Sequence, residues 1–69
     1  MGWREVIKAL SKKGFYVTHQ RGSPIYLADV DRRHKLTVPR HDPIKTGTLL
    51  SIMDQAGLAR DEFIALLQQ

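Results

Sequence analysis

The sequence predicts an α+β fold in which one helix precedes a three-stranded antiparallel sheet and two helices follow it. Three observations support this prediction. Apolar residues near the start of the chain recur at the spacing of one helix face. Three short segments rich in aromatic and β-branched residues come next, each bounded by turn residues. Two further helical patterns close the chain. The expected order is α-β-β-β-α-α, in a single domain over residues 1–69.

The helices are predicted from their apolar spacing and their stop signals. The first should run from about Gly2 to Lys13 and end at Gly14, with an apolar face of Trp3, Val6, Ile7 and Leu10. The second should run from Lys45 to Gly57, with a buried stripe of Leu49, Ile52, Met53 and Ala56. The last, within residues 58–69, has no Ser or Asp at its start, so we expect its first turn to fray.

The three predicted strands are residues 15–20, 25–28 and 34–38, joined by polar turns. Side chains alternate between the two faces of a strand, so every second residue should face the helices. The inward set is Phe15, Val17, Ile25, Leu27, Leu36 and Val38, together with His19 at the end of the first strand. The opposite face should be open to solvent and should carry Tyr16, Thr18, Pro24, Tyr26, Lys35 and Thr37.

Composition narrows the classes of function. The 69 residues include no cysteine, so disulfide frameworks and thiolate metal sites are excluded. No apolar run approaches the roughly 20 residues that span a bilayer, and a cytoplasmic protein without membrane contact is expected. Eleven Lys and Arg residues against seven Asp and Glu give a net charge of +4, and the positive charge gathers between residues 32 and 45. This distribution favours a polyanionic partner.

The middle of the chain contains the best candidate for an anion site. Pro39 lacks a backbone N–H, so the third strand should end at Val38. Arg40, His41 and Lys45 then lie in the connection that leads into the second helix. Free N–H groups at a helix start, with cations close by, favour the binding of phosphate.

Several stretches, in this order along the chain, resemble the HicA family of toxins from bacterial and archaeal toxin–antitoxin pairs. They are Lys13-Gly14-Phe15, Gln20-Arg21-Gly22-Ser23, Thr37-Val38-Pro39-Arg40-His41, Lys45-Thr46-Gly47-Thr48-Leu49 with Ile52, and Gln55-Ala56-Gly57-Leu58 with Glu62-Phe63. The resemblance implies a fold like that of a double-stranded-RNA-binding domain. It also implies metal-independent cleavage of mRNA by an endoribonuclease (an mRNA interferase) that a HicB antitoxin neutralises.

The chain departs from the family pattern at Pro24. The family has a histidine after Gly-Ser, regarded as catalytic, and the ungapped alignment places Pro24 there. Proline can neither accept nor donate a proton, so the acid–base role does not carry over. Three explanations stay open: a natural member that binds RNA without cutting it, a variant inactivated by design or selection, or another histidine that does the chemistry.

Each remaining candidate residue has a functional and a structural interpretation. The candidate RNA contacts are Arg21, Ser23, Lys35, Arg40, His41 and Lys45. For Arg40 and Lys45 the alternative is a solvated basic loop. Tyr16 and Tyr26 either stack on a base or ribose or simply cover the sheet.

Three histidines remain as candidates for acid–base chemistry. His41 is a weak catalytic candidate that otherwise braces its turn, whereas His19 fits a partly buried strand end and His34 a solvated turn. Their spacing gives no metal site, and no cofactor is expected.

Two other functions compete with a toxin that cleaves RNA. A non-catalytic RNA-binding module would share the basic surface but cut nothing, and its affinity would fall with salt. A protein-interaction domain would use the same surface for an acidic partner, and a HicB-like antitoxin would be such a partner. The sequence leaves RNA sequence preference and oligomeric state open.

Overall fold

The computed structural model describes residues 1–20, 22, 24–31 and 33–69. Helix α1 (Trp3–Lys12) is followed by strands β1 (Phe15–His19), β2 (Ile25–Asp29) and β3 (Lys35–Val38), then by helices α2 (Thr46–Ala56) and α3 (Arg60–Leu67). The three strands form one antiparallel sheet in the order β1-β2-β3. The predicted α+β fold and its element order are confirmed.

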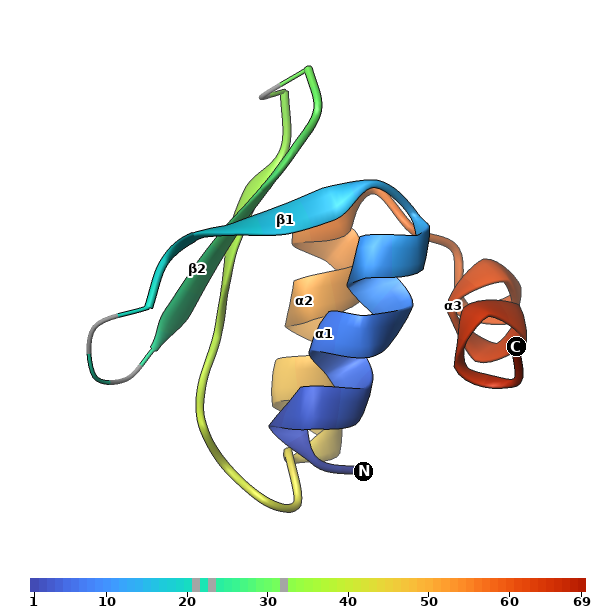
Figure 1. The fold of residues 1–69 in the computed structure, drawn as a ribbon. Coiled ribbons are helices and arrows are strands. Elements are labelled where there is room, and N and C mark those ends of the chain that lie inside the picture. The colour runs from blue at the N-terminus through green and yellow to red at the C-terminus, as the bar shows by residue number, and fades with distance from the viewer. Residues whose placement is uncertain (21, 23, 32) are drawn as a thin grey trace.

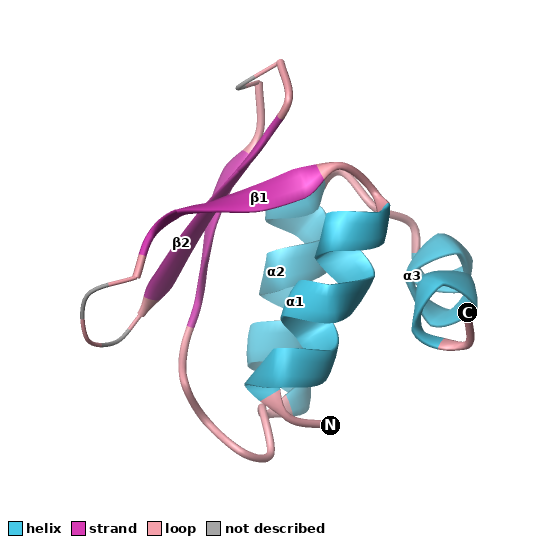
Figure 2. Ribbon diagram, in the orientation of Figure 1, coloured by secondary structure: helices cyan, strands magenta, loops and turns pink. Residues whose placement is uncertain are grey.

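The helices lie on one side of the sheet, as the strands and helices in Figures 1 and 2 show. Between the two layers is an aliphatic core. Its fully buried members include Val6 and Leu10 from α1, Ile25 and Leu27 from β2, and Ile52 from α2. Since each strand has one apolar side, α1 and α2 must cover the same face, and the opposite face of the sheet stays uncovered.

The termini of α2 follow from its end residues. Lys45 is the N-cap, and Gly57 ends the helix with φ +69°, a left-handed conformation that glycine adopts without strain. A Cβ atom at Gly57 would stand 3.0 Å from Nε2 of His34, so the bare glycine also lets the β2–β3 hairpin approach the helix end. The predicted limits of this helix are therefore confirmed to within one residue.

Helix α3 packs on α1 and completes the core. Phe63 is 2% exposed and Leu66 is buried. The Lys12 ammonium donates hydrogen bonds to the carbonyl oxygens of Leu66 (3.2 Å) and Gln69 (2.6 Å), at the C-terminal end of α3, where a cation is favoured. Lys13 forms an ion pair with Glu62. The N-cap is Ala59, and no side chain caps this end of the helix.

Both long helices begin at the same end of the molecule (Figure 1). The amide of Ile44, just before α2, donates to the carbonyl of Met1, just before α1, at 2.8 Å. This bond joins the β3–α2 connection to the N-terminus, and Ile44 itself is buried in the core. The connection that carries Arg40, His41 and Lys45 is therefore anchored near its α2 end.

Candidate nucleic-acid interface

Two rows of side chains cross the open face of the sheet. The strand register pairs Tyr16 with Ala28 and Ala28 with Lys35, which gives one row across all three strands. A second row runs from His19 through Tyr26 to Thr37. Tyr16 and Tyr26 are 41% and 43% exposed, respectively. This face therefore presents aromatic surface, hydroxyl groups and one ammonium group to solvent.

His19 belongs to this open face, which corrects the prediction that it points toward the helices. The pairing of β1 with β2 shifts between Val17 and His19, so that Val17 opposes Leu27 while His19 opposes Tyr26. Such a bulge adds one residue to a strand and reverses the side to which later residues point. The rings of His19 and Tyr26 then meet edge to face, with centroids 6.0 Å apart at 84°.

Val17 was predicted to be buried, but it is 37% exposed. It pairs with Leu27, which is only 2% exposed, and so belongs to the inward row of the sheet. β1 is an edge strand, with a neighbour on one side alone, so its side chains gain less cover than those of central β2.

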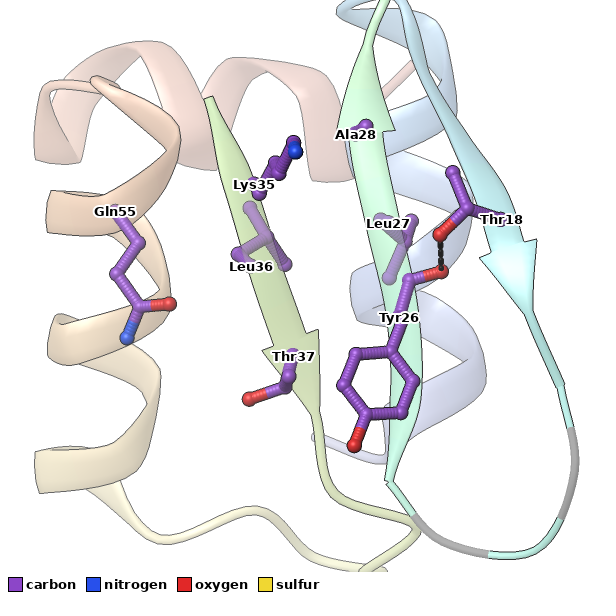
Figure 3. Close-up of a pocket in the computed structure, with 8 residues that line it drawn as sticks. All are labelled: Thr18, Tyr26, Leu27, Ala28, Lys35, Leu36, Thr37 and Gln55. Atoms are coloured by element: carbon purple, nitrogen blue, oxygen red, sulfur yellow. Dashed lines mark hydrogen bonds between the residues drawn. The ribbon is translucent and has the colours of Figure 1, made fainter. Parts of the chain in front are cut away.

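A pocket of about 360 Å³ lies on the open face between the sheet and the side of α2. Figure 3 shows Tyr26 of β2, Lys35 and Thr37 of β3, and Gln55 of α2 around it. The Thr18 hydroxyl donates to the carbonyl oxygen of Tyr26 at 3.4 Å, which ties the bulged strand to this wall. The pocket thus combines one aromatic ring with several hydrogen-bonding groups.

The predicted phosphate contacts of the connection lie at the ends of two helices. The Arg40 guanidinium is 5.3 Å from the centre of the Trp3 ring, and the Arg4 guanidinium is 5.1 Å from it. Cations at this distance are attracted by the indole π-system, so Trp3 holds Arg40 beside the start of α1. Lys45 is the exposed N-cap of α2, whose first turn contains no acidic residue.

The structure also shows the positions of His41 and Asp42 in the connection and of Pro24 before β2. His41 is exposed, and its backbone N–H donates to the Pro39 carbonyl at 2.9 Å. No side-chain hydrogen bond of His41 is found with the described residues. The Asp42 carboxylate lies against Gly2, since a Cβ atom there would be 2.9 Å from its Oδ1. Pro24 is half-buried directly before β2, and the proposed contacts Arg21 and Ser23 fall outside the described residues.

His34 and Asp29 form a pair at the base of the β2–β3 hairpin. The distance from Nδ1 of His34 to Oδ2 of Asp29 is 2.9 Å, and Oδ1 of Asp29 accepts the backbone N–H groups of Arg33 and His34. The hydrogen bond from His34 lowers the pKa of the Asp29 carboxyl from its ordinary value of 3.8, with help from the two backbone donors. The predicted turn histidine is exposed, and its hydrogen bond with Asp29 joins the two ends of the β2–β3 loop.

Neither a metal-binding cluster nor a membrane-spanning helix is found among the described residues. No three His, Asp or Glu side chains there come together in a way that could hold a metal ion. The longest helix, α2, has 11 residues, and none of the described helices is long and apolar enough to cross a bilayer.

Comparison with known families gives one match. A family described as the HicA toxin of bacterial toxin–antitoxin systems matches residues 3–58 of the 69-residue chain. The chain belongs to the HicA toxin family. The match runs from the first residue of α1 to the residue after the C-cap of α2, so it includes the whole sheet and both long helices. No curated protein and no solved structure matches the chain significantly.

Membership of the HicA family makes this chain the toxin of a toxin–antitoxin system, and an antitoxin partner is implied. The open sheet face, its pocket and the basic helix starts all lie within the matched residues. Helix α3 lies beyond them. The candidate interface therefore coincides with the part of the chain that defines the family.

Sequence reasoning missed three features of this HicA-family site. The bulge that turns His19 outward has no signal in the sequence, because alternation assumes an unbroken strand. Gln55 has no functional signal of its own in the sequence, although its place on α2, beside β3, puts it at the pocket. The Asp29–His34 contact could have been found from the Asp at the start of a polar hairpin, a position that favours bonds to backbone N–H groups.

Proposed function

We propose that this HicA-family toxin binds RNA on the open face of its sheet. The observation that carries the proposal is the difference between the two faces of the sheet. The inner face is buried under the helices, whereas the open face carries two exposed tyrosines, Lys35 and a pocket. Proteins recognise unstacked RNA bases by stacking them on aromatic side chains and neutralise the backbone with cations. Both kinds of group are present on this face.

Basic residues of the β3–α2 connection, which begins where β3 leaves the sheet, extend the proposed interface. In this proposal Arg40, His41 and Lys45 contact the backbone of the RNA strand as it leaves the sheet toward the helix starts. Arg40 is held by Trp3, and Lys45 begins α2, where free N–H groups favour phosphate. Arg21 and Ser23, in the turn before β2, are retained as contacts by sequence position alone.

For cleavage we propose His19 as the acid–base group, in place of the family histidine whose position Pro24 occupies. Metal-independent cleavage needs a base for the 2′-OH proton and an acid for the leaving oxygen. His19 is the histidine whose ring contacts Tyr26 on the proposed binding face. His34 is engaged with Asp29, and His41 lies in the connection, where it remains a weaker candidate. Lys35 supplies a cation on the same face.

The proposed partner is an acidic, HicB-like antitoxin in the cytoplasm, where mRNA is available. A net charge of +4 favours an acidic protein as well as RNA. Because the open face is the uncovered side of the sheet, an antitoxin bound there would exclude RNA from it. The second candidate is a non-catalytic RNA-binding module. It follows from Pro24, because a chain without the family histidine can bind RNA and leave it uncut.

The test is binding and cleavage of an end-labelled RNA in EDTA at two salt concentrations. We expect binding that weakens with salt, and cleavage that is lost in His19→Ala or gained in Pro24→His. Lys35→Ala should reduce the slope of log affinity against log salt concentration by about one, because one phosphate contact is lost. Lys8→Ala removes the same charge from the exposed side of α1 and serves as the matched control.

The outcomes separate the proposals. Binding without cleavage by the wild type and both variants would support the non-catalytic module and refute the role of His19. Absence of RNA binding by the folded wild-type chain would refute the proposed function altogether. Equal effects of Lys35→Ala and Lys8→Ala would show that general charge, rather than this face, attracts the RNA.

A further inference from the structure

The shape of the open face limits which kind of RNA it can take. The pocket of about 360 Å³ is a half-open hollow, with β2 and β3 on one side and Gln55 of α2 on the other. Its size is that of a small-ligand site. Bases in a duplex are stacked and paired inside the helix, so a base can enter such a pocket only from an unpaired strand.

Tyr26 provides a wall of this pocket on which a base can stack. Its ring is 43% exposed and is held by the edge contact with His19 at 6.0 Å. Thr37 lies directly opposite Tyr26 in the neighbouring strand, so its hydroxyl is beside the same space. A partly immobilised ring loses little conformational freedom when a base stacks on it.

Gln55 provides a polar group on the opposite wall. Its Nε2 donates to the Ser51 hydroxyl at 3.1 Å, and this bond fixes the amide on the surface of α2. In Figure 3 the amide oxygen of Gln55 is directed toward β3, on the pocket side of the helix. An oriented carbonyl oxygen accepts hydrogen bonds from N–H groups at the edge of a base, which hydrophobic side chains cannot do.

We propose that this pocket binds one unpaired nucleobase of an RNA strand, stacked on Tyr26, with Gln55 and Thr37 hydrogen-bonded to its edge. The proposal rests on the RNA binding proposed above and specifies its substrate class: single-stranded rather than double-stranded RNA. Lys35 lines the same pocket and contacts the adjoining phosphate. Gln55 is then a specificity-determining residue, since bases differ in the donors on their edges.

The experiment measures the affinity of the full chain for fluorescent eight-nucleotide strands of oligo-A, oligo-C and oligo-U, and for a G·C-rich RNA duplex that stays paired under the assay conditions. The wild type should bind its best single strand at least about tenfold more tightly than the duplex, because stacking on one base contributes that much. Tyr26→Ala should lower the affinity for every single strand about tenfold. Tyr26→Phe keeps the ring and should bind with the affinity of the wild type.

In Gln55→Leu, the ratio of the affinities for the tightest and the weakest single strand should change by about five- to tenfold. The reason is that a hydrogen bond to a base edge discriminates among bases. Gln68→Leu makes the same change at an exposed site after α3 and should leave the ratio unchanged. Circular dichroism of each variant checks that it is folded.

The failures of the two proposals are distinguishable. Equal binding of strand and duplex, with unchanged ratios in Gln55→Leu, would overturn the nucleobase pocket but leave RNA binding intact. No binding of any RNA by the folded wild type would overturn the proposed function and this inference together. Tight binding of an acidic protein that Tyr26→Ala abolishes, without RNA affinity, would assign the pocket to a protein partner instead.

Discussion

The two faces of the sheet differ sharply, although the same three strands build both. On the inner face, Ile25, Leu27 and Leu36 are each at most 3% exposed and pack against the helices. On the outer face, Tyr16 and Tyr26 remain more than 40% exposed. Alternation along a strand therefore places the residues that hold the fold directly beside those available for binding. Stability and recognition should be separable by mutating neighbouring positions.

Leu27 and Tyr26 are adjacent in β2 and test this separation most strongly. Leu27→Ala removes a buried side chain and leaves a cavity, so we expect a loss of about 2–5 kcal/mol in the free energy of unfolding. Tyr26→Ala removes an exposed side chain and should cost less than about 1 kcal/mol. Urea denaturation of both variants measures the difference. Equal losses would mean that the outer face is part of the stabilising core.

A substitution at Gly57 tests how closely the β2–β3 hairpin packs against the C-terminal end of α2. Gly57→Ala forces a Cβ atom into a left-handed conformation and toward Nε2 of His34 at 3.0 Å. We expect a loss of at least about 1 kcal/mol by denaturation. The same substitution in a His34→Ala background should cost less, because the steric part is relieved while the backbone strain remains. An identical cost in both backgrounds would rule out the contact.

Lys12 tests the attachment of α3 to α1. Lys12→Met keeps the aliphatic stem but loses the hydrogen bonds to Leu66 and Gln69, so we expect a loss of about 0.5–1.5 kcal/mol. Lys13→Met breaks a surface ion pair with Glu62 and should cost less than about 1 kcal/mol. Amide exchange in α3 should accelerate in Lys12→Met. Unchanged exchange there would show that Phe63 and Leu66 alone hold the helix.

Asp29 gives the smallest expected effect, and it depends on pH. Its pKa is lowered in the folded chain, so its ionised form favours folding above the ordinary value of 3.8. That contribution disappears as the pH falls through the lower, folded-state pKa. The difference in unfolding free energy between the wild type and Asp29→Asn should therefore be present at pH 5 and should shrink in more acidic solution. A difference that grows on acidification would contradict the hydrogen bond from His34.

The fold was predictable because most elements combine a periodic apolar pattern with a clear stop signal. The predicted α2 stripe, closed by Gly57, is an example: Ile52, Met53 and Ala56 are buried, and Leu49 is partly buried against the core. The helical side depends on such local rules, since burial favours one register of each element.

The outer face was less predictable, because it depends on how strands meet. His19 changes sides through a bulge that no local propensity encodes, and Gln55 reaches the pocket only because α2 lies beside β3. The partners of Lys12 lie 54 and 57 residues away along the chain, which no periodicity can reveal. Element type was thus available from the sequence, while the site required the tertiary arrangement.

The most direct test of RNA binding by the open face is a titration of the ¹⁵N-labelled chain with an unpaired RNA strand, followed by amide chemical shifts. We predict that the largest changes fall on residues 16–19, 26, 35–37 and 55, with the amides of α3 nearly unchanged. Changes concentrated on α1 and α3, with the sheet unaffected, would contradict the assignment of this face to RNA.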